Sequence, residues 1–404
     1  MSKSSELSQD NKKKNKRSIS KEREKKLRKL AKLFNKQSVN PAPILKDILI
    51  CMDIAITPEE TDFLLMVGEN HFNYEQLRSL TDISDEKFNA IFESTRHKGM
   101  LNTRYGKNGD RIFKLAPMIP SGWFDDTYLS DGEESPEKRE FAYYFDQAVT
   151  KLEKLNFFPL RPIVDLYSKK SMKNVNTIIA INPPESEKKS IEIDQTVDIP
   201  LSNIYPTPGV YDLIEKYGDS IGVKHCFCTQ WRKMVGDECD FDLPSERCIS
   251  LGDNTRKYTE TGVGRSITKE EAYRIVEESQ KSGAIHTVFY MDEDLNKSEV
   301  AICNCCWDCC GVYRLYNTGA QPLLLKSFYY ASLNDESLCN GCGKCEKYCP
   351  VNTIHLSDKM AVIDKDKCIG CGQCAYQCPQ DAIQLVFQER EVYVPIQKKS
   401  ECRL

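Results

Sequence analysis

Residues 339–350 read CNGCGKCEKYCP, and residues 368–379 read CIGCGQCAYQCP. Both stretches follow the spacing C-x2-C-x2-C-x3-C-P, in which three thiolates on a tight loop each reach a different iron of one [4Fe–4S] cube. The glycines between these cysteines stand where a side chain would crowd the cluster or forbid the backbone angles of the loop. The two copies of the motif therefore predict two iron–sulfur clusters in the C-terminal part of the chain.

In this arrangement the fourth cysteine of each run binds the cluster of the other run. A structural zinc site and a disulfide framework are the alternatives. Zinc sites lack the x3-Cys-Pro step, and disulfides are rare in chains that begin without a secretory signal. The predicted ligands are Cys339, Cys342, Cys345 and Cys378 for the first cluster, and Cys368, Cys371, Cys374 and Cys349 for the second.

The segment between the two runs predicts a hairpin, with short strands at residues 353–356 and 360–363. With this hairpin and the two cysteine runs, residues 333–388 closely resemble the two-cluster ferredoxin domain of bacteria. The resemblance implies a compact β-α-β repeat that carries electrons one at a time between two nearby clusters.

Nine further cysteines lie between residues 226 and 310. Thiolates at this density favour a soft metal, as an iron–sulfur cluster, zinc or copper(I). We favour one or two additional iron–sulfur clusters over zinc, because two clusters are already predicted, and we expect adjacent cysteines to divide between two centres. His225 is a further candidate ligand or hydrogen-bond donor. The nine cysteines are Cys226, Cys228, Cys239, Cys248, Cys303, Cys305, Cys306, Cys309 and Cys310.

Residues 200–388 also resemble a family of uncharacterised ferredoxin-containing proteins of anaerobic bacteria and archaea. The resemblance implies electron transfer with additional iron–sulfur ligation, and it implies no substrate. Within it, the helix start at Thr268 and Glu271 is a capping box. The features that carry the resemblance are the C-x-C at residues 226–228, the Cys239, Pro244 and Cys248 set, residues 264–272 (GRSITKEEA), and the CNCC at 303–306.

Charge is unevenly distributed along the 404 residues. Residues 1–33 hold 13 Lys and Arg against 4 Asp and Glu, a surplus of nine, so with a net charge of −4 the remainder lies near −13. This pattern predicts a disordered arm over residues 1–40 that attracts anionic surfaces, with a narrow apolar stripe at Leu27, Leu30 and Phe34. No signal peptide or membrane-spanning run stands out, so we expect a cytoplasmic protein from an oxygen-poor environment.

Residues 41–124 predict three helices followed by a hairpin, an order that resembles a winged helix. That resemblance implies DNA binding, with the third helix, near residues 85–98, in the major groove. The helix begins with Asp85 and Glu86, which are unsuited to phosphates, so we favour a protein-docking module and keep DNA as the alternative. The basic residues that could touch a DNA backbone are Arg96, His97, Lys98, Arg104, Lys107 and Arg111.

The fold class expected from these patterns is a multidomain α+β chain. Nucleotide and hydrolase motifs such as the dinucleotide fingerprint, the P-loop and the nucleophile elbow are missing from the sequence, so we expect an electron relay with a redox partner, such as a flavoprotein. The alternatives are a redox-sensing regulator of transcription and a reductase with substrate at the Cys-rich centre. The predicted segments are a basic arm (1–40), a winged-helix-like domain (41–124), a linker with a helix (125–200), a Cys-rich α/β metal domain (201–332), a ferredoxin domain (333–388) and a tail (389–404).

Overall fold

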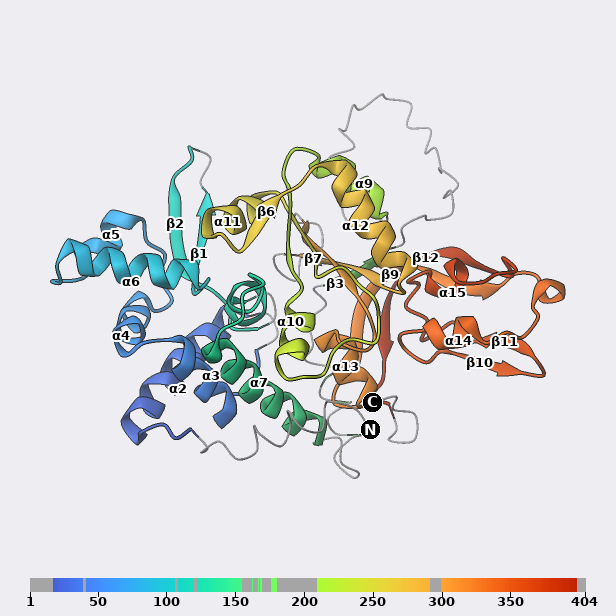
Figure 1. The fold of residues 1–404 in the computed structure, drawn as a ribbon, viewed down its shortest axis with the longest axis horizontal. Coiled ribbons are helices and arrows are strands. Elements are labelled where there is room, and N and C mark those ends of the chain that lie inside the picture. Colours follow the sequence, from blue (N-terminus) through green and yellow to red (C-terminus); the bar gives the residue numbers. More distant parts are fainter. Residues whose placement is uncertain are drawn as a thin grey trace. The chain divides into compact units, whose positions relative to one another are not determined.

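The computed structural model describes residues 17–38, 41–105, 108–119, 122–154, 162, 166, 168, 176–179, 209–290 and 299–397. The chain is mixed α/β and divides into two compact units (Figure 1). Unit 1 comprises residues 1–155, 224–240 and 253–266, and unit 2 comprises residues 156–223, 241–252 and 267–404. The cysteine-rich segment, expected as one domain over 201–332, is therefore shared between the two units.

Packing within unit 1 explains this division. Phe145 lies 4.9 Å from the ring of Trp231, and the Lys224 ammonium lies 2.6 Å from a carboxylate oxygen of Asp126. Buried rings and a buried ion pair thus hold residues 224–240 against the N-terminal helices, although more than 70 residues separate the partners in sequence.

Unit 1 is mostly helical, and its helices begin at residues that the sequence marks as caps. The Thr57 side chain accepts from the Glu60 amide in a capping box, and Ser84 accepts from the Lys87 amide. Its elements are α2 (Lys21–Lys36), α3 (Lys46–Ala55), α4 (Pro58–Val67), α5 (Tyr74–Ser79), α6 (Asp85–His97), the hairpin β1 (Leu101–Tyr105) and β2 (Arg111–Leu115), the π-helical turn η1 (Trp123–Tyr128), α7 (Pro136–Lys154), α10 (Phe227–Met234), α11 (Asp253–Thr261) and β6 (Gly264–Ser266).

The structure differs from the prediction of a disordered basic arm. Residues 21–36 form α2, which packs on α3 and α4 and buries Leu27, Leu30 and Phe34. The Phe34 ring lies 5.8 Å from that of Trp123. Apolar residues spaced three and four apart make one face of a helix, so the stripe that the sequence shows is enough to fold this segment onto unit 1 despite its high charge. Residues 1–16 of the arm lie outside the described part of the chain.

Unit 2 contains a mixed sheet in the strand order β12-β9-β3-β7-β8-β5-β4. β3 runs parallel to β9, whereas β12–β9, β3–β7, β7–β8 and β5–β8 are antiparallel pairs. Helices α9 (Val210–Tyr217) and α12 (Lys269–Lys281) bury their apolar faces in the core of this sheet. The strands are β3 (Asn176–Ile179), β4 (Ile221–His225), β5 (Glu246–Leu251), β7 (Ile285–Tyr290), β8 (Glu299–Cys305), β9 (Leu323–Leu333) and β12 (Ile383–Val394).

The two cysteine runs lie between β9 and β12 (Figure 1). The predicted hairpin is confirmed, with Ile354 opposite Ile363. The predicted tail is partly wrong, because residues 389–394 continue β12 and pair with β9, burying Val392 and Val394. The elements here are α13 (Gly311–Asn317), the 3-10 turn η3 (Glu336–Leu338), α14 (Lys344–Tyr348), β10 (Ile354–Ser357), β11 (Met360–Ile363) and α15 (Gln373–Tyr376).

Among the described residues, none of the helices combines the length and the apolar character that crossing a bilayer requires.

Candidate metal centres

The eight cysteines of the two runs line two cavities in unit 2. Each cavity takes three thiols from one run and one thiol from the other, which is the grouping that the spacing predicts. We call them the first and the second cavity. The first is lined by Cys339, Cys342, Cys345 and Cys378, and the second by Cys349, Cys368, Cys371 and Cys374.

Two glycines show why the loops around these cavities fold as they do. Gly341 and Gly370 have φ values of +69° and +67°, which disfavour any residue with a Cβ. A Cβ on Gly341 would lie 2.5 Å from the Lys359 carbonyl oxygen, and one on Gly370 would lie 1.9 Å from that of Tyr329. The loops therefore pass against neighbouring backbone, which only glycine permits. This cradle of thiols on tight glycine turns fits a [4Fe–4S] cube.

The two cavities differ in exposure. In the first, Cys342 is exposed and Cys339 and Cys378 are half-buried. In the second, all four cysteines are buried, from 5 to 7 % exposed for Cys349, Cys368 and Cys374. The first set of cysteines is therefore the more accessible to solvent of the two.

Burial favours the protonated thiol at Cys345 and Cys374 when no metal is bound. It raises the pKa of the Cys345 thiol to about 11 and the pKa of Cys374 well above the ordinary value. At Cys368 the Ala331 N–H, which donates to Sγ at 3.3 Å, opposes the rise in pKa that burial causes. The Thr353 N–H donates to Cys349 Sγ at 3.4 Å. A soft cation would displace the protons, and these amides would then stabilise the thiolates.

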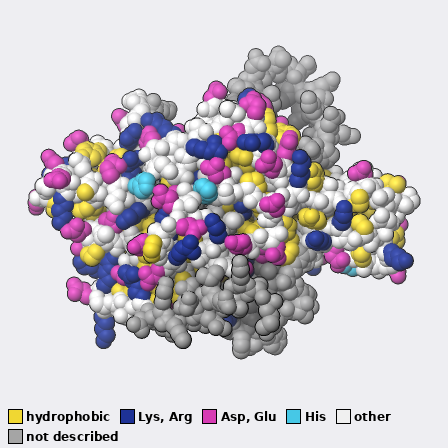
Figure 2. All heavy atoms as spheres, in the orientation of Figure 1, with side chains coloured by type: hydrophobic (Ala, Val, Ile, Leu, Met, Phe, Trp, Pro, Cys, Tyr) yellow, Lys and Arg dark blue, Asp and Glu magenta, His cyan; other side chains and the backbone are white. Residues whose placement is uncertain are grey.

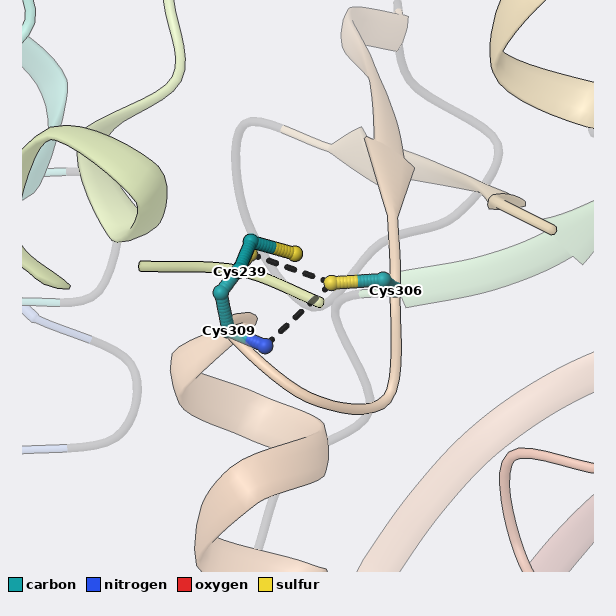
Figure 3. A group of neighbouring side chains, drawn as sticks. All are labelled: Cys239, Cys306 and Cys309. Carbon is teal, nitrogen blue, oxygen red and sulfur yellow. Dashed lines mark hydrogen bonds between the residues drawn. The ribbon is translucent and has the colours of Figure 1, made fainter. Parts of the chain in front are cut away.

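Six of the nine middle cysteines belong to unit 2, where adjacent cysteines separate into two sets. Cys303 lies opposite Cys248 in the β5–β8 ladder, and the Cys305 thiol hydrogen bonds with Cys303 and Cys310. Cys306 instead pairs with Cys309: their sulfurs lie 3.0 Å apart, and the Cys309 N–H donates to Cys306 Sγ at 3.2 Å (Figure 3). The adjacent cysteines thus contact different thiols, and their division between two metal centres stays a prediction.

The other three, Cys226, Cys228 and Cys239, belong to unit 1, where Cys226 immediately precedes α10. The predicted ligand His225 also lies there, and a Cβ on Gly132 would be 2.3 Å from its Nε2. The structure thus places the His225 ring against the backbone at Gly132, and its role toward a metal stays a prediction.

Sequence reasoning missed the polar residues that support the β5–β8 cysteines. Arg247 is 1 % exposed, and it donates to the Asn304 carbonyl at 3.0 Å and to Cys309 Sγ at 3.6 Å. The Asn304 amide donates to the Arg247 carbonyl, while its Oδ1 lies 2.6 Å from His286 Nδ1. Burial lowers the pKa of His286 to about 4, so the ring is neutral and Nδ1–H donates to Asn304. The one sign of these supporting residues in the sequence is that an arginine and an asparagine stand next to cysteines in otherwise apolar strands.

Comparison with known proteins identifies one region. Residues 338–390 match the family model of the 4Fe-4S dicluster domain. No curated protein and no solved structure matches the chain. The C-terminal region is therefore similar to 4Fe-4S dicluster domains, and it has the capacity for iron–sulfur electron transfer.

Proposed function

We propose that this protein relays single electrons through two [4Fe–4S] clusters, to or from a partner redox enzyme. The observation that carries the proposal is the pair of cavities, each lined by three cysteines of one run and the fourth cysteine of the other. The first cavity would hold one cluster and the second cavity the other, and each bound cluster would supply one-electron chemistry.

The burial of the ligands supports a direction for the relay. Cys342 is exposed, whereas Cys371 and Cys374 are buried. Electron exchange with another protein requires close approach, so the partner would dock beside the first cavity. The second cavity, whose cysteines are all buried, would then connect with groups inside unit 2.

The middle cysteines would hold one or two further centres, with iron–sulfur favoured over zinc. Within unit 2, the Cys306 and Cys309 sulfurs lie 3.0 Å apart, so these two thiols would bind the same centre.

The winged-helix-like part of unit 1 would dock a protein. Of its basic residues, Lys98 lies 2.7 Å from Glu60, Arg96 lies 2.8 Å from Glu93, and Arg111 lies 3.1 Å from a carboxylate. Charges that are already paired gain little from DNA phosphates. On the described part of the face drawn in Figure 2, basic and acidic side chains are interspersed. Binding to one DNA operator that persists at high salt and changes with oxidation state would instead identify a regulator.

The experiment is anaerobic purification of the full chain, followed by counts of iron, acid-labile sulfide and zinc, with EPR after reduction by dithionite. Cys342→Ala should remove or convert the signal of one cluster, because it removes a ligand of the first cavity. Cys51→Ala is the matched control, since Cys51 is a buried thiol of unit 1 that bonds only a backbone carbonyl among the contacts described. Full iron and full reducibility in Cys342→Ala would refute the ligand assignment.

A further inference from the structure

Strands β5 and β8 bring three cysteines to one face of the sheet. Cys248 and Cys303 are direct partners in the antiparallel ladder. Side chains at opposed positions stand on the same face, with Cβ atoms about 4.5–5.5 Å apart. Cys305 lies two residues after Cys303 and therefore shares this face.

A fourth thiol reaches the same place from the start of α13. Cys310 immediately precedes this helix and is 4 % exposed. The Cys305 thiol hydrogen bonds with both Cys303 and Cys310. We call Cys248, Cys303, Cys305 and Cys310 the strand-face group. It is separate from the loop pair, Cys306 and Cys309, whose sulfurs contact each other.

A series of hydrogen bonds connects the strand-face group with the second cavity. Gln373, which stands between Cys371 and Cys374 in sequence, donates to the Gln280 carbonyl at 3.4 Å. The Gln280 side chain lies 2.6 Å from His286 Nε2. The other nitrogen of His286 bonds Asn304, the residue between Cys303 and Cys305.

We propose that Cys248, Cys303, Cys305 and Cys310 are the ligands of a third iron–sulfur cluster, which exchanges electrons with the cluster of the second cavity. The inference rests on the proposed function. Four soft thiolates suit iron–sulfur ligation, and the neighbouring cluster is a redox partner of the same class. The exchange is a one-electron step: the cluster of the second cavity is oxidised by one electron, the third cluster is reduced by one, and no bond is made or broken.

The test compares three full-length proteins purified anaerobically: the wild type, Cys303→Ala/Cys305→Ala, and the matched control Cys306→Ala/Cys309→Ala. The first variant should lose about four irons per chain while the EPR signals of the two dicluster-domain clusters persist. Those signals should also sharpen, because magnetic coupling to a near neighbour is gone. The control should keep these irons, since its cysteines belong to the loop pair.

Two results would overturn the inference and leave the proposed function intact. In one, the first variant loses zinc and no iron, which would make the strand-face group a structural site. In the other, both double variants lose the same irons, which would mean one shared centre. A wild type without the two dicluster-domain signals would overturn the proposed function itself.

A milder variant covers the case in which the double variant does not fold. Cys305→Ser keeps a ligating oxygen in place of the sulfur, so the third cluster should remain but change its reduction potential and its EPR spectrum. The dicluster-domain signals should stay at their wild-type positions. A spectrum and potentials identical to the wild type would overturn the assignment.

Discussion

A comparison of Gly370 with Gly343 distinguishes the cost of an unfavourable backbone conformation from the cost of a steric clash. Both have positive φ values, +67° and +73°, so a Cβ costs each about 1–2 kcal/mol. A Cβ on Gly370 would also strike the Tyr329 carbonyl oxygen at 1.9 Å, whereas one on Gly343 would meet only Leu356 at 3.7 Å. We expect Gly370→Ala to destabilise unit 2 by about 1–3 kcal/mol more than Gly343→Ala and to lower the iron bound at the second cavity. Iron counts and denaturant unfolding of both variants check this, and equal losses would contradict it.

His286 predicts a pH dependence of stability. Burial lowers its pKa from 6.5 to about 4, so as the pH falls through this range the unfolded chain takes up a proton and the folded chain does not. The free energy of unfolding is therefore unaffected above pH 6.5. It decreases on acidification below that pH, by up to about 3 kcal/mol. His286→Gln should lose less free energy of unfolding than the wild type between neutral and mildly acidic pH. Parallel pH profiles for the two proteins would show that the ring titrates normally.

At the level of residues, the spacing of cysteines close in sequence predicts metal ligands. Contacts between residues that are far apart in sequence could not be predicted. The eight cysteines of the two runs could be grouped from sequence because their ligand pattern is confined to 40 residues. Arg247, Asn304 and His286 could not be found in this way, since they meet only when β5, β7 and β8 pair. Their roles depend on strand register, which single residues do not reveal.

At the level of elements, α2 shows how a small apolar stripe outweighs a large charge. Leu30 is fully buried in α2, while Lys29 on the same helix is exposed. We expect Leu30→Ala to lower the free energy of unfolding of unit 1 by about 2–5 kcal/mol. Lys29→Ala, the matched control, should change it by no more than about 0.5 kcal/mol. Thermal or denaturant unfolding of the two variants measures these changes. A Leu30→Ala variant as stable as the wild type would mean that α2 does not contribute to the core.

The elements themselves could be predicted where capping residues and apolar periodicity agree, as for the helix at residues 136–154 and the hairpin at 354–363. The boundary predicted between residues 388 and 389 falls within β12, whose centre is exposed and polar. Its pairing with β9 is what extends it to Val394, and pairing partners distant in sequence leave little local signal.

At the level of the whole molecule, metal removal should affect the two units differently. The thiols of both cavities are held by loops of unit 2 that contain little regular structure, so bound clusters would contribute much of the folding free energy there. Hydrogen exchange after chelation should become faster across residues 339–380 and stay unchanged in α3 and α7 of unit 1. Exchange that speeds up equally in both units would contradict this independence.

The crossed ligands also have a consequence for biosynthesis. The first cavity has only three of its thiols until Cys378 has left the ribosome, and the second cavity depends on Cys349 from the earlier run. A nascent chain that stops short of residue 374 can complete neither set. Cluster insertion is therefore expected to be a late maturation step in which both clusters are acquired together, so that partially loaded molecules are rare.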